Sequence, residues 1–231
     1  MKHPTSYRTS IIGRTAGRLG VLTAACLTAL AVAAPAEAST FSYPGHGVAV
    51  VHDRATTHAD RAHPDQYRDS FAIHELGAVF GLGADNRATA VSAGCSASHP
   101  CRSIALSFQI VTMAGSHVRI NATNLGRAVN EQCPGCQTLA GAYQFIVSTP
   151  APFSLDAQAR NQLAVIHHRL DALQTSNASI DDIKQRADAL AAQVKTILDR
   201  AAAAAPKDRE VNPLGTTGPS VTMHRHFDGP S

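Results

Sequence analysis

The sequence has no excess of charge of either sign once its first 38 residues are set aside. The chain of 231 residues holds 20 Lys and Arg and 17 Asp and Glu. Residues 1–38 carry four of the basic residues and one of the acidic ones: Lys2, Arg8, Arg14, Arg18 and Glu37. The remaining 16 basic and 16 acidic residues balance, and they form none of the positive clusters that nucleic-acid binding needs. We therefore expect no nucleic-acid partner.

The sequence also lacks the short motifs of common enzymes. It contains no glycine-rich phosphate loop, no Gly-x-Ser-x-Gly elbow and no constellation of paired carboxylates. We accordingly expect no catalytic residue, no cofactor and no metal ligand.

Long hydrophobic runs are absent except for one near the start. This run, residues 19–34, has about 16 residues, fewer than the roughly 20 that a membrane-spanning helix needs. It follows a basic leader, and Ala36-Glu37-Ala38 fits a signal-peptidase site, so residues 1–38 are expected to be a signal peptide cleaved near Ala38-Ser39. No Arg-Arg pair precedes the run, which favours the general secretory route. We expect a secreted protein with no membrane contact after cleavage, and an uncleaved anchor is the alternative.

What the sequence does contain is a pattern that occurs twice. Four residues recur with identical spacing, Asn86, Ala90, Val91 and Cys95 as Asn124, Ala128, Val129 and Cys133. After a second cysteine, residues 102–110 match residues 137–145 without a gap. We expect two copies of one small unit packed together.

The periodicity inside the two copies predicts alternating strands and helices. Residues 103–112 and 139–148 are apolar runs of strand length, and a weaker run begins at residue 71. Residues 85–93 and 123–131 each open with a helix N-cap candidate and continue with alanines, which predicts helices. The order β-α-β-α-β favours parallel strands with right-handed crossovers. We expect a small two-repeat α/β domain over residues 70–150.

Three further regions complete the expected organisation. Residues 39–69 are polar and histidine-rich, and we interpret them as an extended N-terminal arm. Residues 153–205 are helical by pattern, and residues 206–231, rich in proline and glycine, are expected to be a disordered tail.

Within residues 153–205 the apolar residues recur at three- and four-residue spacing on both sides of residues 175–178. The two stripes are out of heptad register, which favours a helical hairpin over one long coiled-coil helix. Ser154 and Ser179 are the expected N-caps. We expect the hairpin to pack on the sheet or on itself. Its alternative role is an interface with a protein partner or with a second copy of the chain.

Four cysteines lie beyond the leader: Cys95, Cys101, Cys133 and Cys136. An oxidising destination favours two disulfides. Repeat symmetry favours Cys95–Cys101 and Cys133–Cys136, and Pro134-Gly135 suits a tight turn between the second pair. Cross-repeat pairing remains open. A redox motif and a four-cysteine zinc site are less favoured, because the second pair precedes a strand rather than a helix and because zinc requires thiolates.

One segment comes close to a zinc-protease motif. Residues 74–85 resemble the metzincin helix, in which two further histidines follow the first at fixed positions. Ala78 and Ala84 occupy those positions, although Glu75 stands where the general base would be. The repeat alignment also places His74 and Glu75 on a strand, which would send them to opposite faces. We do not expect zinc proteolysis.

Gln109 and Gln144 are matched polar residues inside otherwise apolar strands. Buried amides need partners, so we expect them to bond each other or the backbone. A ligand is the alternative partner.

The segments Cys-Arg-Ser-Ile-Ala-Leu-Ser-Phe-Gln-Ile-Val, residues 101–111, and Cys-Pro-Gly-Cys-Gln-Thr-Leu-Ala-Gly-Ala-Tyr-Gln-Phe-Ile-Val, residues 133–147, resemble a group of secreted actinobacterial proteins. A similar cysteine-containing region occurs in actinobacterial proteins labelled as peptide zinc metalloproteases. The similarity covers residues 70–150, and the membrane protease part of those larger proteins has no counterpart here. The resemblance implies an extracytoplasmic accessory domain and no catalytic or metal residue.

These observations predict a secreted, non-catalytic module that serves a structural or protein-binding role. The alternative is an extracytoplasmic enzyme, either a hydrolase or a thiol–disulfide protein.

Overall fold

A computed structural model describes residues 39–41, 47–115, 117–206 and 218–229, all within the unit Pro35–Ser231. The expected signal peptide, residues 1–38, lies outside the described residues. The described elements are β1 (Ser39–Phe41), β2 (Gly47–Ala59), β3 (Asp65–Ala93), β4 (Arg102–Ala114), β5 (Arg119–Glu131), β6 (Gln137–Thr149), α1 (Ala157–Asp171), α2 (Ile180–Ala204) and β7 (Ser220–Asp228).

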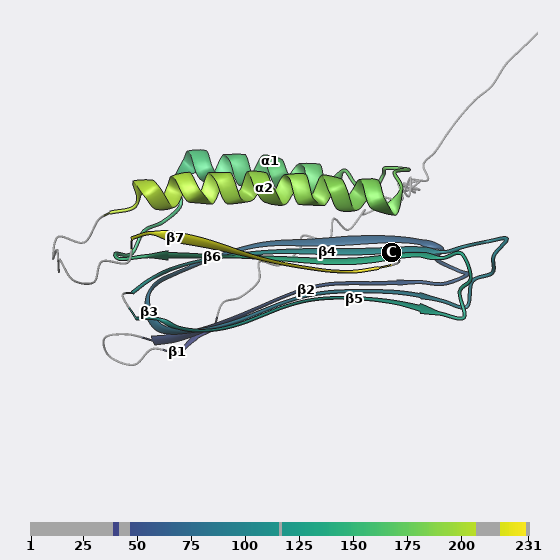
Figure 1. The fold of residues 1–231 in the computed structure, drawn as a ribbon, viewed down its shortest axis with the longest axis horizontal. Helices are drawn as coiled ribbons and strands as arrows, with labels where there is room; N and C mark the ends of the chain where they lie inside the picture. The colour runs from purple at the N-terminus through teal and green to yellow at the C-terminus, as the bar shows by residue number, and fades with distance from the viewer. Residues whose placement is uncertain (1–38, 42–46, 116, 207–217, 230–231) are drawn as a thin grey trace, which may run out of the picture. The chain divides into compact units, whose positions relative to one another are not determined.

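Strand β3 takes part in two layers of strands (Figure 1). Its first half pairs in parallel with β4, and its second half pairs in parallel with β2 and β5. Gly77, with a φ of 65°, lies where the pairing changes, and positive φ values favour glycine. One layer therefore has the order β3-β4-β6-β7, and the other has β1-β2-β3-β5. From β2 to β6 the chain alternates between the layers, as in a flattened parallel β-solenoid with three turns.

Residues that match in the sequence lie opposite one another on neighbouring strands. Asn86 of β3 pairs with Asn124 of β5, and Gln109 of β4 pairs with Gln144 of β6. An earlier turn, β2 with the first half of β3, continues the same register, because Asp53 lies opposite Asn86. This turn escaped the sequence comparison because few of its residues are identical to those of the later turns.

The prediction of helices at residues 85–93 and 123–131 was wrong, because both segments are strands. In the first segment, burial alternates with a period of two: Asn86, Ala88, Ala90 and Ser92 point into the space between the layers. Small residues fill this part of the space, so the alternation of apolar and polar residues that marks a strand is too weak to detect in the sequence. Pairing with strands on both sides of β3 outweighs the helix propensity of alanine.

The expected arm and tail also need correction. Residues 47–59, interpreted as part of a polar arm, form β2, whose alternate residues are buried. The expected domain boundary at residue 70 falls inside β3. Of the expected disordered tail, Ser220–Asp228 forms β7, which pairs antiparallel with β6. A polar strand at the edge of a sheet has little apolar content, so its sequence resembles that of a tail.

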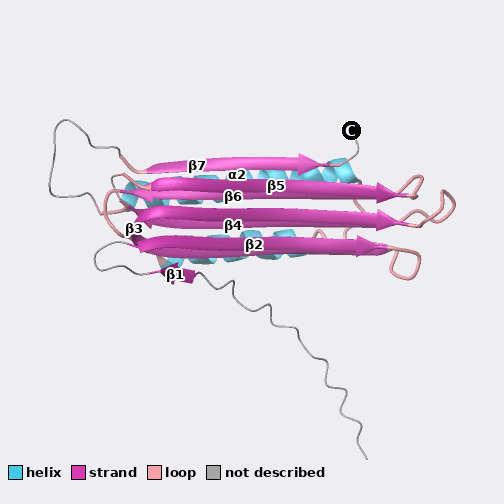
Figure 2. Ribbon diagram, turned by 90° about the horizontal axis from the view of Figure 1, so that it is seen from below, coloured by secondary structure: helices cyan, strands magenta, loops and turns pink. Residues whose placement is uncertain are grey.

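The helical hairpin and the predicted α/β class are confirmed, although most elements are strands. α1 begins at the N-cap Asp156 rather than at Ser154, and α2 begins at the predicted N-cap Ser179, whose hydroxyl accepts from Asp182 N. Both helices pack on the β4–β6 face as expected, with Leu163 and Ile183 fully buried against Phe108 and its neighbours. Figure 2 shows the strands side by side with the helices behind them.

Of the helices that the structure describes, none combines the length and the hydropathy needed to cross a bilayer.

Candidate functional site

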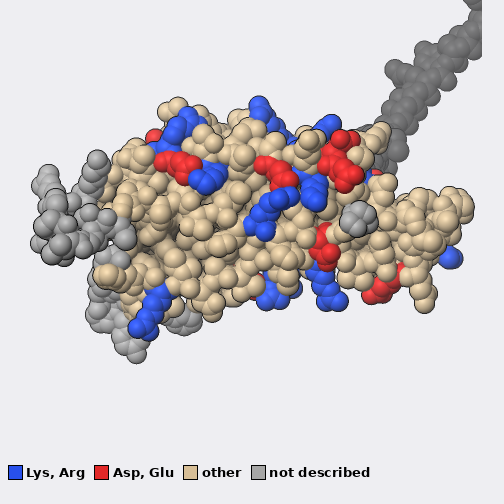
Figure 3. Space-filling model, in the orientation of Figure 1, with Lys and Arg blue, Asp and Glu red and all other residues tan. Residues whose placement is uncertain are grey.

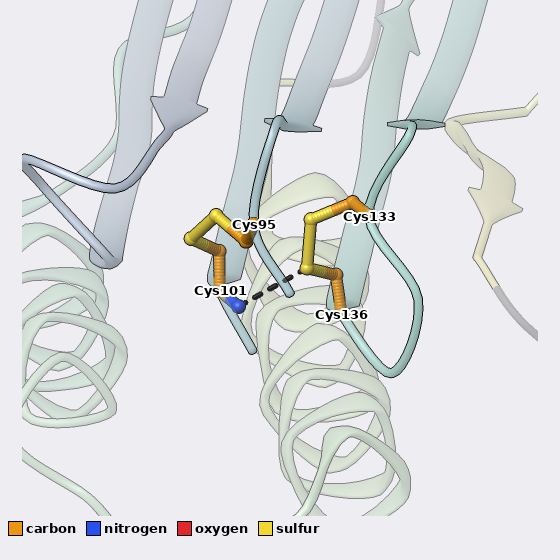
Figure 4. A group of neighbouring side chains, drawn as sticks. All are labelled: Cys95, Cys101, Cys133 and Cys136. Atoms are coloured by element: carbon orange, nitrogen blue, oxygen red, sulfur yellow. Dashed lines mark hydrogen bonds between the residues drawn. A yellow bond between two sulfur atoms is a disulfide. The ribbon is translucent and has the colours of Figure 1, made fainter. Parts of the chain in front are cut away.

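The four cysteines gather at one end of the strands and form the two disulfides favoured by repeat symmetry (Figure 4). Cys95–Cys101 connects the end of β3 to the start of β4, and Cys133–Cys136 connects β5 to β6. The Cα atoms are 5.9 and 5.5 Å apart. The pairing prediction is confirmed, but each bridge joins two strands rather than a helix and a strand.

The disulfides are shielded from solvent and lie next to each other. All four cysteines are between 1% and 8% exposed, and Cys101 N donates to Cys136 Sγ at 3.1 Å. A sulfur inside a disulfide is not a thiolate, so the paired sulfurs offer no metal ligand. Such bridges are typical of an oxidising, extracytoplasmic environment. Their burial fits a structural role better than a redox role.

The segment that resembles a zinc-protease helix is part of strand β3. His74 is 3% exposed and donates to Asp53 Oδ2 at 2.8 Å, between the two layers. Glu75 lies on the opposite face, where it accepts from Leu155 N and pairs with Arg160. The prediction that a strand separates these two side chains is confirmed, so they do not form a shared catalytic site.

A ladder of polar side chains runs through the space between the layers. Gln144 Nε2 donates to Gln109 Oε1 at 2.8 Å, which confirms that the two amides bond each other. Gln109 Nε2 in turn donates to Asp53 Oδ2 at 2.7 Å, next to His74. All four side chains are between 0% and 6% exposed. Most polar atoms of the ladder bond one another and solvent does not reach them, although Gln144 Oε1 has no hydrogen-bond partner among the described residues. We therefore interpret the ladder as structural.

The accessible candidate site is a groove on the outer side of the helical hairpin, lined by residues of α1 and α2. Its volume is about 810 Å³, within the range of ligand and peptide pockets. Val165, which is 50% exposed, is its accessible large apolar side chain, and Ile166 and Ile197, 3% and 6% exposed, form its floor. An apolar surface of this kind, rimmed by polar groups, often marks an interaction site.

Two arginines give the hairpin groove its charge. Arg169 of α1 donates to Gln193 of α2 at 3.2 Å, and Arg200 of α2 donates to Gln162 of α1 at 3.4 Å. Within the described part of the chain neither guanidinium pairs with a carboxylate, and no acidic residue lines the groove. The groove therefore suits a ligand that combines an apolar surface with negative charge.

A second group of ionisable side chains lies where α1 ends above β3. His167 Nε2 is 3.2 Å from Asp69 Oδ2 and 3.6 Å from Asp171 Oδ1. The Asp69 carboxylate raises the pKa of His167, and burial, followed by the charge of Asp69, raises the pKa of Asp171. Both side chains therefore keep a proton to a higher pH than usual.

A partly buried tyrosine, Tyr67, and a fully buried one, Tyr143, anchor the hairpin to the sheet. Tyr67 donates to Leu170 O at 2.7 Å, and Tyr143 donates to Asp188 Oδ1 at 2.9 Å. Burial is the main cause that raises the pKa of each phenol far above its ordinary value. Both tyrosines therefore stay neutral hydrogen-bond donors in the folded protein.

The sequence alone did not reveal the residues of the hairpin groove or the group formed by Asp69, His167 and Asp171. Arg169 and Arg200 each stand on the polar face of a helix, a position that carries no signal until the two helices are placed together. Acidic and basic side chains are intermixed on the face shown in Figure 3, without a large area of one sign.

No protein-family model, no curated protein and no solved structure matches this chain.

Proposed function

We propose that this protein is a secreted, non-catalytic binding module whose hairpin groove holds an amphipathic, acidic segment of a partner protein. The observation that carries the proposal is the groove itself, an accessible apolar surface with two arginines that lack carboxylate partners among the described residues. A segment with an apolar face and flanking carboxylates complements both features.

The rest of the described molecule supports a scaffold rather than a catalyst. Several of its buried polar groups bond one another in the ladder between the layers, and its cysteines are paired and shielded from solvent. The inner faces of both helices are buried on the sheet, which holds the groove in a rigid shape. A preorganised groove loses little conformational entropy on binding.

The direct test uses synthetic peptides. A helical peptide with leucines on one face and glutamates beside them should bind about tenfold or more tightly than the same peptide with lysines, because the lysines face arginines. Fluorescence anisotropy with the disulfide-bonded chain measures both affinities. Equal binding of the two peptides, or binding of neither, would contradict the proposal.

Variants locate the binding site. Val165→Glu and Arg169→Glu should each weaken binding of the acidic peptide. Val165→Glu places a charge on the apolar lining, and Arg169→Glu replaces an attractive charge with a repulsive one. Arg54→Glu, an exposed arginine of β2 on the other layer, is the matched control and should leave binding unchanged. Analytical ultracentrifugation of the same proteins tests self-association. A dimer that Val165→Glu abolishes would assign the groove to a second copy of the chain instead.

A further inference from the structure

Three potential metal ligands meet at a corner that the hairpin groove does not include. Asp69 comes from β3, and His167 and Asp171 come from the last turns of α1, one helical turn apart. One ligand atom from each side chain lies within 4.8 Å of both others. The three side chains are thus assembled from two distant parts of the sequence.

The spacing of these atoms fits a tetrahedral transition-metal ion. Two ligand atoms bound at about 2.0–2.1 Å to a tetrahedral Zn²⁺ are about 3.4 Å apart. The His167 nitrogen lies 3.2 and 3.6 Å from the two carboxylate oxygens, on either side of that value. A set of one imidazole and two carboxylates favours Zn²⁺ or a related divalent ion over Ca²⁺ and Mg²⁺, which prefer oxygen ligands alone.

An unsatisfied buried atom points into the same corner. The side chain of Asp69 is only 10% exposed, and its Oδ2 accepts no hydrogen bond in the described structure. Although His167 Nε2 is close to this oxygen, the contact lacks the geometry of a hydrogen bond. A buried carboxylate oxygen without a hydrogen-bond donor costs free energy, which a bound cation would recover.

The surroundings hold the three ligands in place. The ring of Phe71 stacks on the His167 imidazole, with centroids 5.0 Å apart and planes at 15°. Asp171 is the last residue of α1, and the C-terminal end of a helix favours positive charge. Packing and the helix dipole therefore both support a cation at this position.

From this arrangement we propose that Asp69, His167 and Asp171 bind one Zn²⁺ ion, or a related divalent transition-metal ion. The three side chains supply three ligands, and water completes the tetrahedron. The ion ties the C-terminal end of α1 to β3, so it stabilises the docking of the hairpin on the sheet.

Isothermal titration with Zn²⁺ and with Ca²⁺ tests the proposal on the disulfide-bonded chain after treatment with a chelator and without reductant. We expect one Zn²⁺ per chain and much weaker Ca²⁺ binding. His167→Gln should lower the affinity for Zn²⁺ by about 100-fold or more, because it removes a direct ligand. His168→Gln is the matched control, because the side chain of His168 is 82% exposed and its Nδ1 lies 3.9 Å from Asp171, yet it is none of the three proposed ligands. This variant should bind Zn²⁺ nearly as tightly as the unsubstituted chain does.

Co²⁺ gives a second readout, because tetrahedral Co²⁺ absorbs visible light. The absorption should appear with the unsubstituted chain and with His168→Gln, and it should be lost with His167→Gln and with Asp69→Asn. If Asp69→Asn does not fold, the His167→Gln variant, altered at a half-exposed side chain, decides the question. Equal Zn²⁺ binding by His167→Gln and the unsubstituted chain, or loss of binding in His168→Gln alone, would overturn the site.

Discussion

Small and polar side chains fill part of the space between the two layers of strands, and Asn86 makes the most hydrogen bonds among those that the structure describes. Asn86 is fully buried and donates to Asn124 Oδ1 at 2.8 Å and to the Tyr143 carbonyl at 2.9 Å. Its own oxygen accepts from the Ser107 hydroxyl at 2.6 Å. One amide therefore connects three strands of the solenoid, which makes this asparagine a determinant of the register.

Asn86→Ala should lower the free energy of unfolding by about 3 kcal/mol, because it leaves several buried polar groups without partners. Urea denaturation followed by circular dichroism measures the change. Asn121→Ala, at an exposed position of β5, makes the same substitution without burial and should change stability by less than about 0.5 kcal/mol. Equal effects of the two variants would show that the buried amide network contributes little.

The buried Tyr143 predicts a loss of stability in alkaline solution. Its pKa is raised in the folded protein, mainly by burial, while the unfolded chain keeps the ordinary value near 10. Below pH 10 the phenol is neutral in both states, so its stabilising contribution is fully present there. As the pH rises above 10, the unfolded state releases a proton that the folded state retains, and stability falls.

Tyr143→Phe should therefore flatten the decrease in the free energy of unfolding between about pH 10 and pH 11. Urea denaturation at a series of pH values compares the variant with the unsubstituted chain. A decrease of the same steepness in both proteins would rule out Tyr143 as a contributor.

Among the elements, β7 closes one end of the solenoid although its sequence is polar. It pairs with the edge of β6, and two of its side chains also cover the edge of β5. Gly126 N donates to His226 Nδ1 at 3.0 Å, and Ala128 N donates to Asp228 Oδ2 at 2.9 Å. These contacts satisfy edge groups that would otherwise be free to pair with another chain.

The close approach of β5 to β6 and β7 depends on the absence of a side chain at Gly126. A Cβ there would lie 2.6 Å from the Ala140 carbonyl oxygen and 3.0 Å from the His226 carbonyl oxygen. Gly126→Ala should therefore push backbone segments apart and cost about 1–3 kcal/mol of stability. Thermal unfolding measured by circular dichroism gives the change.

Gly83→Ala is the matched control on the neighbouring strand. Its Cβ would lie 3.6 Å from the nearest atom, a methyl carbon of Val50, which is ordinary contact. Stability close to that of the unsubstituted chain is expected. Equal stability of Gly126→Ala and Gly83→Ala would contradict the close packing of β5 against β6 and β7.

The described unit as a whole consists of three layers: the helical hairpin, the β4–β6 layer and the β2–β5 layer (Figure 1). Large apolar side chains lie between the helices and the sheet. The space between the strand layers contains alanine and polar groups toward the disulfides, and larger apolar side chains such as Leu82, Val111 and Met113 toward the other end. The two disulfides lie at one end of this second space, where successive turns of the solenoid come together. They hold the strands together at the end of this space where the side chains are mainly alanine and contribute less hydrophobic stabilisation.

Replacing Cys133 and Cys136 together by serine should lower the free energy of unfolding by about 2 kcal/mol, the value expected for a short loop. The fold should persist, because β5 pairs with β3 and β6 pairs with β4 whether or not the bridge is closed. Urea denaturation gives the stability, and thiol titration confirms that Cys95–Cys101 remains closed. Complete unfolding of the variant would show that the bridge is required for the fold itself.

The sequence by itself determined the features that depend on local spacing. The cysteine pairs are close in the chain, the helices have a clear three- and four-residue period, and the strands at residues 103–112 and 139–148 are apolar and β-branched. The expectation that Gln109 and Gln144 bond each other or the backbone also followed, since buried amides need partners, and the structure shows bonds of both kinds.

Only the tertiary structure decided the elements and sites that depend on distant neighbours. Residues 85–93 and 123–131 are alanine-rich, so their strand conformation comes from ladder pairing on the sheet rather than from propensity. β2 and β7 are polar and become strands because an adjacent edge offers hydrogen bonds. The hairpin groove and the group of Asp69, His167 and Asp171 form where separate elements meet. Contacts between residues far apart in the chain leave no periodic pattern in the sequence.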